Sequence, residues 1–463
     1  MTEVERLAAF VTRARYRDMT ADAREQLRIR VLDSIGCAAG ALDAAPIAAV
    51  RAQTEDFGGN PLCTLIGGPG KSGPDRAAFF NGALVRYLDF MDSYLAKGET
   101  CHPSDNLAPV LAAAEYADAG GEEFLSALAV AYQVQARLSD EAPVRARGFD
   151  HTTQGAYAVG AGVAKALGLD AERTAHAIAL SGTGNIALRV TRTGTLSHWK
   201  GLAYPNTAFI GTHAAFLAMR GITGPLEVFE GNKGFKDSVS GPFTIDWPAE
   251  NLERITRTIV KKYNAEIHAQ SAIEGALDLK RQHGIRGADV AAVTVAIFDV
   301  AHRIIGGGEE GDKTAVATKE QADHSLPYMI AAALCDGELL PAQYAPERIH
   351  APDVQDLLRR VTVTPSAEFS ARFPGEMACR VTIALHHDRR LMVEKRDYEG
   401  FHTRPMSWDG VVRKFHNLAG PFATADALDA IVDSIARLHR LRVRDLTALL
   451  ARLHPDPSRG DPP

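Results

Sequence analysis

Closely spaced cysteines are missing from this chain of 463 residues. Its five cysteines stand far apart, at Cys37, Cys63, Cys101, Cys335 and Cys379. Zinc ribbons, thioredoxin-type motifs and the common iron–sulfur motifs need cysteines a few residues apart, so this spacing supports none of them. Reduced and mostly buried thiols in a cytosolic protein are the favoured interpretation, and an iron–sulfur site assembled from distant cysteines is a minor alternative.

Long apolar runs and a large excess of one charge are also missing. No stretch approaches about 18 uninterrupted apolar residues, so we expect no transmembrane helix and no membrane partner. The N-terminus carries Glu3, Glu5 and Arg6 where a secretory signal would have an apolar core, which favours a cytoplasmic location. The net charge of -6 gives no general attraction to nucleic acid.

The remaining composition is that of a globular protein. Hydrophobic residues make up 46% and charged residues 23%, which argues against disorder, and the length predicts two or three domains. Only the tail at 456–463, rich in Pro and Asp, is predicted to be flexible.

Two patterns of hydrophobic spacing divide the chain. Up to about residue 265 it is rich in Ala and Leu, and helices are predicted over the N-terminus and over 21–42, 106–119, 122–139, 155–167, 171–183 and 205–220. Strands are predicted over 291–302, 359–366 and 379–400, with a helix at 320–336 between them. Apolar residues at helical spacing then predict helices again in the C-terminal part of the chain. The prediction is a mainly α protein with an α+β second domain, and the helical domain is discontinuous if the last helices pack on the first ones.

Motifs of several enzyme classes are absent. No GxGxxG follows a predicted strand and no GxxxxGK[ST] loop occurs, so no nucleotide cofactor is indicated. HExxH and GxSxG are absent too, which leaves zinc proteases and nucleophile-elbow hydrolases without support.

Five polar segments lie in apolar or glycine-rich surroundings, at 86–106, 148–155, 192–201, 261–271 and 321–328. Each also has a purely structural explanation. Ser104 or Asp105 can cap a helix, His151 can be a structural histidine, and Lys200 can be a solvated surface lysine. Together, however, the segments supply His, Lys, Arg and Asp without metal-ligand spacing. That combination is suited to binding a polycarboxylate.

These segments resemble the MmgE/PrpD family, which includes 2-methylcitrate dehydratase and cis-aconitate decarboxylase. The resemblance covers roughly residues 5–450. It rests on the stretches VLDSIGCAAGAL (31–42), NGALVRYLDF (81–90), HPSDNLAPVLAAAEY (102–116), LSHWKGLAYPN (196–206), GPLEVFEGNKGF (224–235), KKYNAEIHAQSAIEGAL (261–277) and ADHSLPYMIAAALCDGEL (322–339).

The resemblance implies a large helical domain from both chain ends, at 1–268 and 402–455, and a smaller α+β lid domain at 269–401. It further implies a homodimer, a small di- or tricarboxylate substrate, and no metal or other cofactor.

The resemblance also implies site residues, motif by motif. The catalytic residues it implies are Asp89, His102, His151, Lys200 and Lys261. The substrate-binding residues expected beside them are Ser93, Arg192, Glu266 and His268. Ser93 stands in place of a family threonine. Glu266 stands where the decarboxylase has a histidine, which favours the dehydratase side of the family.

These residues predict a cofactor-independent hydro-lyase acting on 2-methylcitrate or a related hydroxy-tricarboxylate. Such a reaction needs a base for the α-proton, an acid for the departing hydroxyl and cations for the carboxylates. We expect His102 to be the principal acid/base, oriented by Asp89, and Lys200 and Lys261 to hold carboxylates. cis-Aconitate decarboxylation or imino-dicarboxylate epimerisation is an alternative on the same scaffold, and a non-catalytic carboxylate-binding protein is a second.

Overall fold

A computed structural model describes residues 1–194, 196–308 and 311–454. The chain forms two compact units. As far as their residues are described, the first comprises Met1–Arg192, His198–Thr258 and Ser407–Pro463, and the second comprises Thr193–Ser197 and Ile259–Met406. The predicted tail at 456–463 lies outside the described residues. The domain boundaries at 268/269 and 401/402 remain a prediction.

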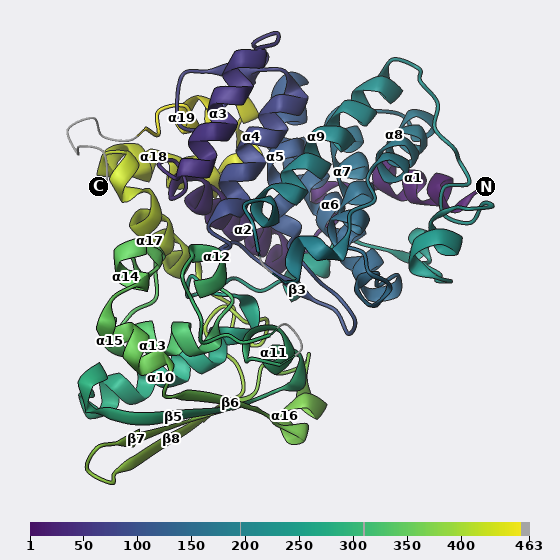
Figure 1. The fold of residues 1–463 in the computed structure, drawn as a ribbon. Helices are drawn as coiled ribbons and strands as arrows, with labels where there is room; N and C mark the ends of the chain where they lie inside the picture. The colour runs from purple at the N-terminus through teal and green to yellow at the C-terminus, as the bar shows by residue number, and fades with distance from the viewer. Residues whose placement is uncertain (195, 309–310, 455–463) are drawn as a thin grey trace. The chain divides into compact units, whose positions relative to one another are not determined.

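The first unit is helical and is built from both chain ends, as predicted (Figure 1). Its N-terminal part contributes α1 (Glu3–Arg13), α2 (Ala21–Ala39), α3 (Ala45–Phe57), α4 (Pro74–Tyr87), α5 (Leu107–Tyr116), α6 (Gly121–Glu141), α7 (Thr152–Ala166), α8 (Ala171–Gly184) and α9 (Trp199–Met219). Its C-terminal part contributes α17 (Trp408–Ala419), α18 (Ala425–Ala436) and α19 (Val443–Leu450). Helices α17 and α2 approach so closely that a Cβ on Gly36 would lie 3.3 Å from the Phe415 backbone.

Small residues set the spacing of the central helices in this unit. A Cβ on Gly160 of α7 would lie 3.0 Å from the Ala177 carbonyl oxygen on α8. On another side of α7, a Cβ on Gly162 would lie 2.9 Å from the Cβ of Ala131 on α6. Because real Cβ atoms do not approach this closely, a larger residue at either position would push the helices apart. The short segments that carry the polar residues are thus attached to closely packed helices.

The second unit contains a four-stranded mixed sheet in the order β6-β5-β7-β8. Strand β5 (Val290–Ile297) pairs parallel with β6 (Val361–Pro365) and antiparallel with β7 (Cys379–Leu385), which pairs antiparallel with β8 (Arg390–Lys395). Helices α10 (Gln270–His283), α13 (Leu326–Asp336) and α15 (Pro352–Leu358) belong to the same unit (Figure 1). Helix α10 packs on the sheet at Gly275, where a Cβ would lie 3.1 Å from Val393. The predicted α+β character of this region is confirmed.

Several predicted elements have different bounds in the structure, and the strand expected at 379–400 is in fact two strands, β7 and β8. The strand expected at 291–302 ends at Ile297, and α11 (Asp299–Ile305) follows because the Asp299 N–H donates to the Ser370 hydroxyl. The helix expected at 320–336 is split into α12 (Lys319–Ala322) and α13, since Ser325 caps a new helix start. Helix α9 begins at Trp199, well before the predicted 205, with Pro205 inside it.

No helix in the described part of the chain is both long enough and apolar enough to cross a membrane.

Candidate active site

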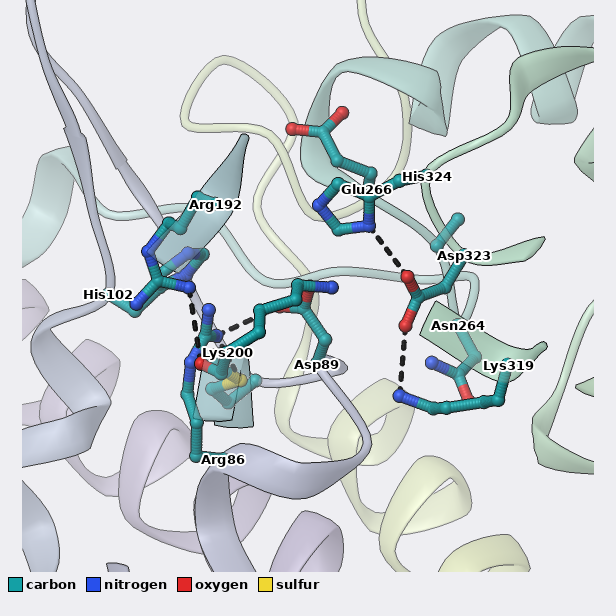
Figure 2. Close-up of polar contacts among 12 residues, drawn as sticks. Arg86, Asp89, His102, Arg192, Lys200, Asn264, Glu266, Lys319, Asp323 and His324 are labelled. Carbon is teal, nitrogen blue, oxygen red and sulfur yellow. Dashed lines mark hydrogen bonds and ion pairs between the residues drawn. The ribbon is translucent and has the colours of Figure 1, made fainter. Parts of the chain in front are cut away.

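Asp89 follows the end of α4 and is buried between two cations of the helical unit. The Arg86 Nη1 lies 2.9 Å from its Oδ1, and the Lys200 Nζ lies 3.3 Å from its Oδ2 (Figure 2). All three side chains are at most 7% exposed. Asp89 has a φ of 53°, in the left-handed region, which an aspartate tolerates better than most residues. This conformation lets the residue just after α4 meet both cations.

A second ion pair, between Arg192 and Asp150, holds the predicted residue Arg192 in place. The Arg192 Nε lies 2.6 Å from the Asp150 Oδ2, and its Nη1 donates to the Lys200 carbonyl oxygen over 3.3 Å. Burial alone would raise the pKa of Asp150, but the charge of Arg192 outweighs it and holds this pKa well below its usual range. Arg192 is thus fixed to the start of the helix that carries Lys200. The structure brings Arg86, Arg192 and Lys200 together in one part of the helical unit (Figure 2).

A short hairpin places His102 beside Ser93. Strands β3 (Tyr94–Leu95) and β4 (Thr100–Cys101) are antiparallel with Tyr94 opposite Cys101, so the residues flanking that pair also face each other. The His102 Nδ1 lies 2.8 Å from the Asp92 carbonyl oxygen and 3.1 Å from the Ser93 hydroxyl. A carbonyl oxygen can only accept, so Nδ1 carries a proton, and in the neutral ring the lone pair would belong to Nε2.

This orienting contact is one that the sequence analysis missed. It comes from the backbone of Asp92, whose own carboxylate accepts the Ser104 N–H over 3.0 Å. Orientation of His102 by Asp89, as expected from the sequence, remains a prediction.

His151 packs against His102, and its burial favours the neutral form. The two imidazole centroids lie 5.4 Å apart in an edge-on arrangement. The Tyr204 ring stacks on the His151 imidazole with a centroid distance of 6.2 Å. Burial lowers the pKa of His151 well below its ordinary value, and Arg192 and Arg86 add to this effect, while Asp150 opposes it. Neither ring nitrogen has a hydrogen-bond partner among the described residues.

Tyr204 is a further residue that the sequence analysis did not name. Its hydroxyl donates to the Asn106 Oδ1 at 2.9 Å and lies 3.2 Å from the Gln135 Oε1. A Cβ on Gly155 would lie 2.4 Å from the Tyr204 ring, so α7 needs glycine at this point. The sequence could have indicated Tyr204 by its position. It stands four residues after Lys200, which puts both side chains on one face of α9.

The segment at 261–271 lies in the second unit and forms its own buried cluster. The His268 Nδ1 lies 2.7 Å from the Glu266 Oε1, and its backbone N–H donates to Oε2 over 2.8 Å. Burial would raise the pKa of Glu266, but His268 lowers it to about 2. Glu266 caps a 3-10 turn (Ile267–Ala269), and Gln270 accepts from the Lys262 and Tyr263 N–H groups.

The second unit holds two further polar groups, Lys261 and an Asp–His pair. Lys261 is buried, at 1% exposure. The segment at 321–328, noted in the sequence but assigned no role there, holds an Asp–His pair. The His324 Nδ1 lies 2.6 Å from the Asp323 Oδ1, and the Lys319 Nζ lies 2.9 Å from Oδ2 (Figure 2). A buried carboxylate that fixes one imidazole nitrogen is an arrangement suited to acid–base chemistry.

The fold agrees with what comparison of the chain with known proteins shows. Residues 5–248 match the MmgE/PrpD N-terminal domain, and residues 263–439 match the MmgE/PrpD C-terminal domain. The chain therefore belongs to the MmgE/PrpD family.

Curated relatives cover most of the chain at modest identity. The 2-methylcitrate dehydratase of Escherichia coli (strain K12) is 30% identical over 404 residues, which are 80% of this chain and 81% of the relative. The 2-methylcitrate dehydratase of Cupriavidus necator is 28% identical over 75% of this chain and 74% of its own length. The cis-aconitate decarboxylase of Mus musculus is 26% identical over 93% of this chain and 89% of its own length.

Proposed function

We propose that this protein is a hydro-lyase that dehydrates 2-methylcitrate or a closely related hydroxy-tricarboxylate without a cofactor. The observation that carries the proposal is the cluster of Arg86, Arg192 and Lys200 in the unit that also holds His102. Guanidinium and ammonium groups are the natural partners of substrate carboxylates, and the oriented imidazole supplies a base. Relatives named 2-methylcitrate dehydratase support the substrate class.

The reaction removes a proton and a hydroxide from neighbouring carbons. The His102 Nε2 lone pair takes the α-proton, and the electrons of that C–H bond form the new C=C bond as the C–O bond breaks. The departing hydroxide receives a proton from the protonated His102 and leaves as water, which returns the imidazole to its starting form. Lys200 and Arg192 stabilise the charge that develops on the substrate carboxylate, an electrostatic contribution that is often the largest in such sites.

The remaining predicted residues have supporting roles in this proposal. Asp89 keeps Lys200 and Arg86 in place, Ser93 and Asp92 hold the His102 tautomer, and His151 forms a neutral wall beside His102. Lys261 binds a carboxylate, and the Glu266–His268 pair contributes to substrate binding. The predicted homodimer and cytoplasmic location belong to the same proposal.

cis-Aconitate decarboxylation is the second candidate, because the relative that covers the largest share of this chain among those described above carries that activity in its name. The buried Glu266, paired with His268, stands where the decarboxylase has a histidine and argues against it. Imino-dicarboxylate epimerisation also begins with removal of an α-proton and would use the same base.

A proton NMR time course in D₂O tests the proposal, with EDTA-treated protein and 2-methylcitrate. Loss of the CH₂ signals together with growth of a methylaconitate methyl signal supports the dehydratase. Deuterium uptake without a net product shows a working base and a different substrate, and the experiment then moves to cis-aconitate and imino-dicarboxylates. An unchanged spectrum, with tight binding of the acid, would instead favour a carboxylate-binding protein.

A further inference from the structure

Asp105 is a buried carboxyl group of the helical unit that the proposed mechanism does not use. It lies in the 3-10 turn η2 (Pro103–Asn106), and its backbone N–H donates to the His102 carbonyl oxygen over 3.0 Å. The residue is 3% exposed, and neither carboxyl oxygen has a hydrogen-bond partner in the part of the chain that the structure describes. An ionised carboxylate placed in this way lacks both water and donors, which penalises the charged form.

Charges from several directions act on this carboxyl group. Burial raises its pKa to about 7, which Arg86 and Arg192 counteract and which Asp92 and Asp89 reinforce. The elements packed on η2 are α2, α4, α5, α6, α7 and α9. Further buried ionisable groups stand on or beside these elements, among them Arg30 and Asp33 on α2, Tyr132 on α6, Asp150 and His151 before α7, and Lys200 and Tyr204 on α9.

We infer that Asp105 takes up a proton when a polycarboxylate binds near Arg86 and Arg192, and that it thereby compensates part of the charge of the incoming anion. The inference rests on the proposed function only in requiring a polycarboxylate ligand. In the free protein the two guanidinium groups favour the ionised form of Asp105. A bound anion brings negative charge to the same guanidinium groups and opposes that ionised form. The protonated form is then favoured.

Thermodynamic linkage fixes the sign of the effect. Because the complex holds more protons than the free protein, affinity rises as the pH falls through the region where Asp105 titrates. At a pH where Asp105 is partly ionised in the free protein, binding should take up a fraction of a proton from the buffer, and this group can take up one proton at most.

Isothermal titration calorimetry in buffers of different ionisation enthalpy measures this uptake. The probe is tricarballylate, which has three carboxylates and no hydroxyl group to eliminate, so turnover does not contribute. We expect the observed enthalpy to increase with the ionisation enthalpy of the buffer for the wild type, with a positive slope of at most one proton. Asp105→Asn should reduce the slope to near zero. Asp105→Glu, which retains a titrating group, should keep a positive slope.

Two controls keep the test decisive. Asp388→Asn changes the same side chain at an exposed position and should leave the slope unchanged. If Asp105→Asn does not fold, infrared difference spectra of the wild type give the answer, because the C=O stretch of a protonated carboxylic acid should grow when tricarballylate is added. Binding with a zero slope in the wild type overturns the inference and leaves the proposed function intact. No binding of tricarballylate or of 2-methylcitrate overturns both.

Discussion

The helical unit and the second unit each hold a buried histidine, but they fix it in opposite ways. His102 donates from Nδ1 to a backbone carbonyl in a region that also contains Arg86, Arg192 and Lys200. His268 points the same nitrogen at the carboxylate of Glu266. A backbone carbonyl is a neutral partner that can only accept a hydrogen bond, whereas the Glu266 carboxylate brings a negative charge to its imidazole. The same side chain thus has a neutral partner in one unit and a charged partner in the other.

The largest expected effect is on His102. Removal of this imidazole by His102→Ala should lower turnover of 2-methylcitrate by about 10²-fold or more, because no other base replaces its Nε2. The rate is measured by the NMR time course, and circular dichroism verifies the fold. His268→Ala is the matched change in the second unit and should affect KM more than turnover. Near-normal turnover in His102→Ala would remove it from the mechanism and end the contrast between the two histidines.

The second largest effect is expected from the loss of a cation, which should weaken substrate binding. Lys200→Ala should raise KM for the tricarboxylate by about 10-fold or more, because a charge-assisted contact to a carboxylate is worth about 1.5–3 kcal/mol. Steady-state kinetics give the value. Lys97→Ala, at an exposed position, serves as the control. If KM does not change in Lys200→Ala, this lysine does not hold a substrate carboxylate.

The Glu266–His268 pair should change how the free energy of unfolding depends on pH at acid pH. The folded-state pKa of Glu266 is lowered from 4.5 to about 2, so its contribution is fully present above pH 4.5 and is lost as the pH falls toward 2. Glu266→Gln should remove about 1–3 kcal/mol of stability at neutral pH and flatten the acid side of the profile. Denaturant unfolding from pH 3 to pH 7 tests this. Parallel profiles for wild type and variant would contradict the ion pair.

The smallest expected effect is on the Ser93 hydroxyl. Ser93→Ala removes the 3.1 Å contact with the His102 Nδ1 but leaves the Asp92 carbonyl in place. One neutral hydrogen bond is worth about 0.5–1.5 kcal/mol, so turnover should fall by only about 2- to 10-fold. Ser93→Thr keeps the hydroxyl and should restore most of the rate. A loss as large as that of His102→Ala would mean that Ser93 itself takes part in the chemistry.

Hydrophobic spacing predicted most helices of this fold, because an apolar stripe can be read from consecutive residues. It failed at residues 298–302, where a hydroxyl from Ser370, distant in sequence, starts a helix after β5. The same limit applies to the site. The types and positions of Lys200 and Arg192 were visible in the sequence, but the Asp150 partner and the Asp92 carbonyl contact depend on how loops fold back. No local pattern encodes such contacts.

The left-handed backbone at Asp89 has a consequence for laboratory evolution of this protein toward other substrates. Because a bulky or β-branched side chain is strained at a φ of 53°, random replacement at this position will mostly reduce folding before it changes selectivity. Asparagine and glycine are the replacements that the backbone accepts readily. A useful mutant library would therefore allow only these two replacements at position 89. It would vary Ser93 more widely, because the Ser93 backbone does not lie in the left-handed region.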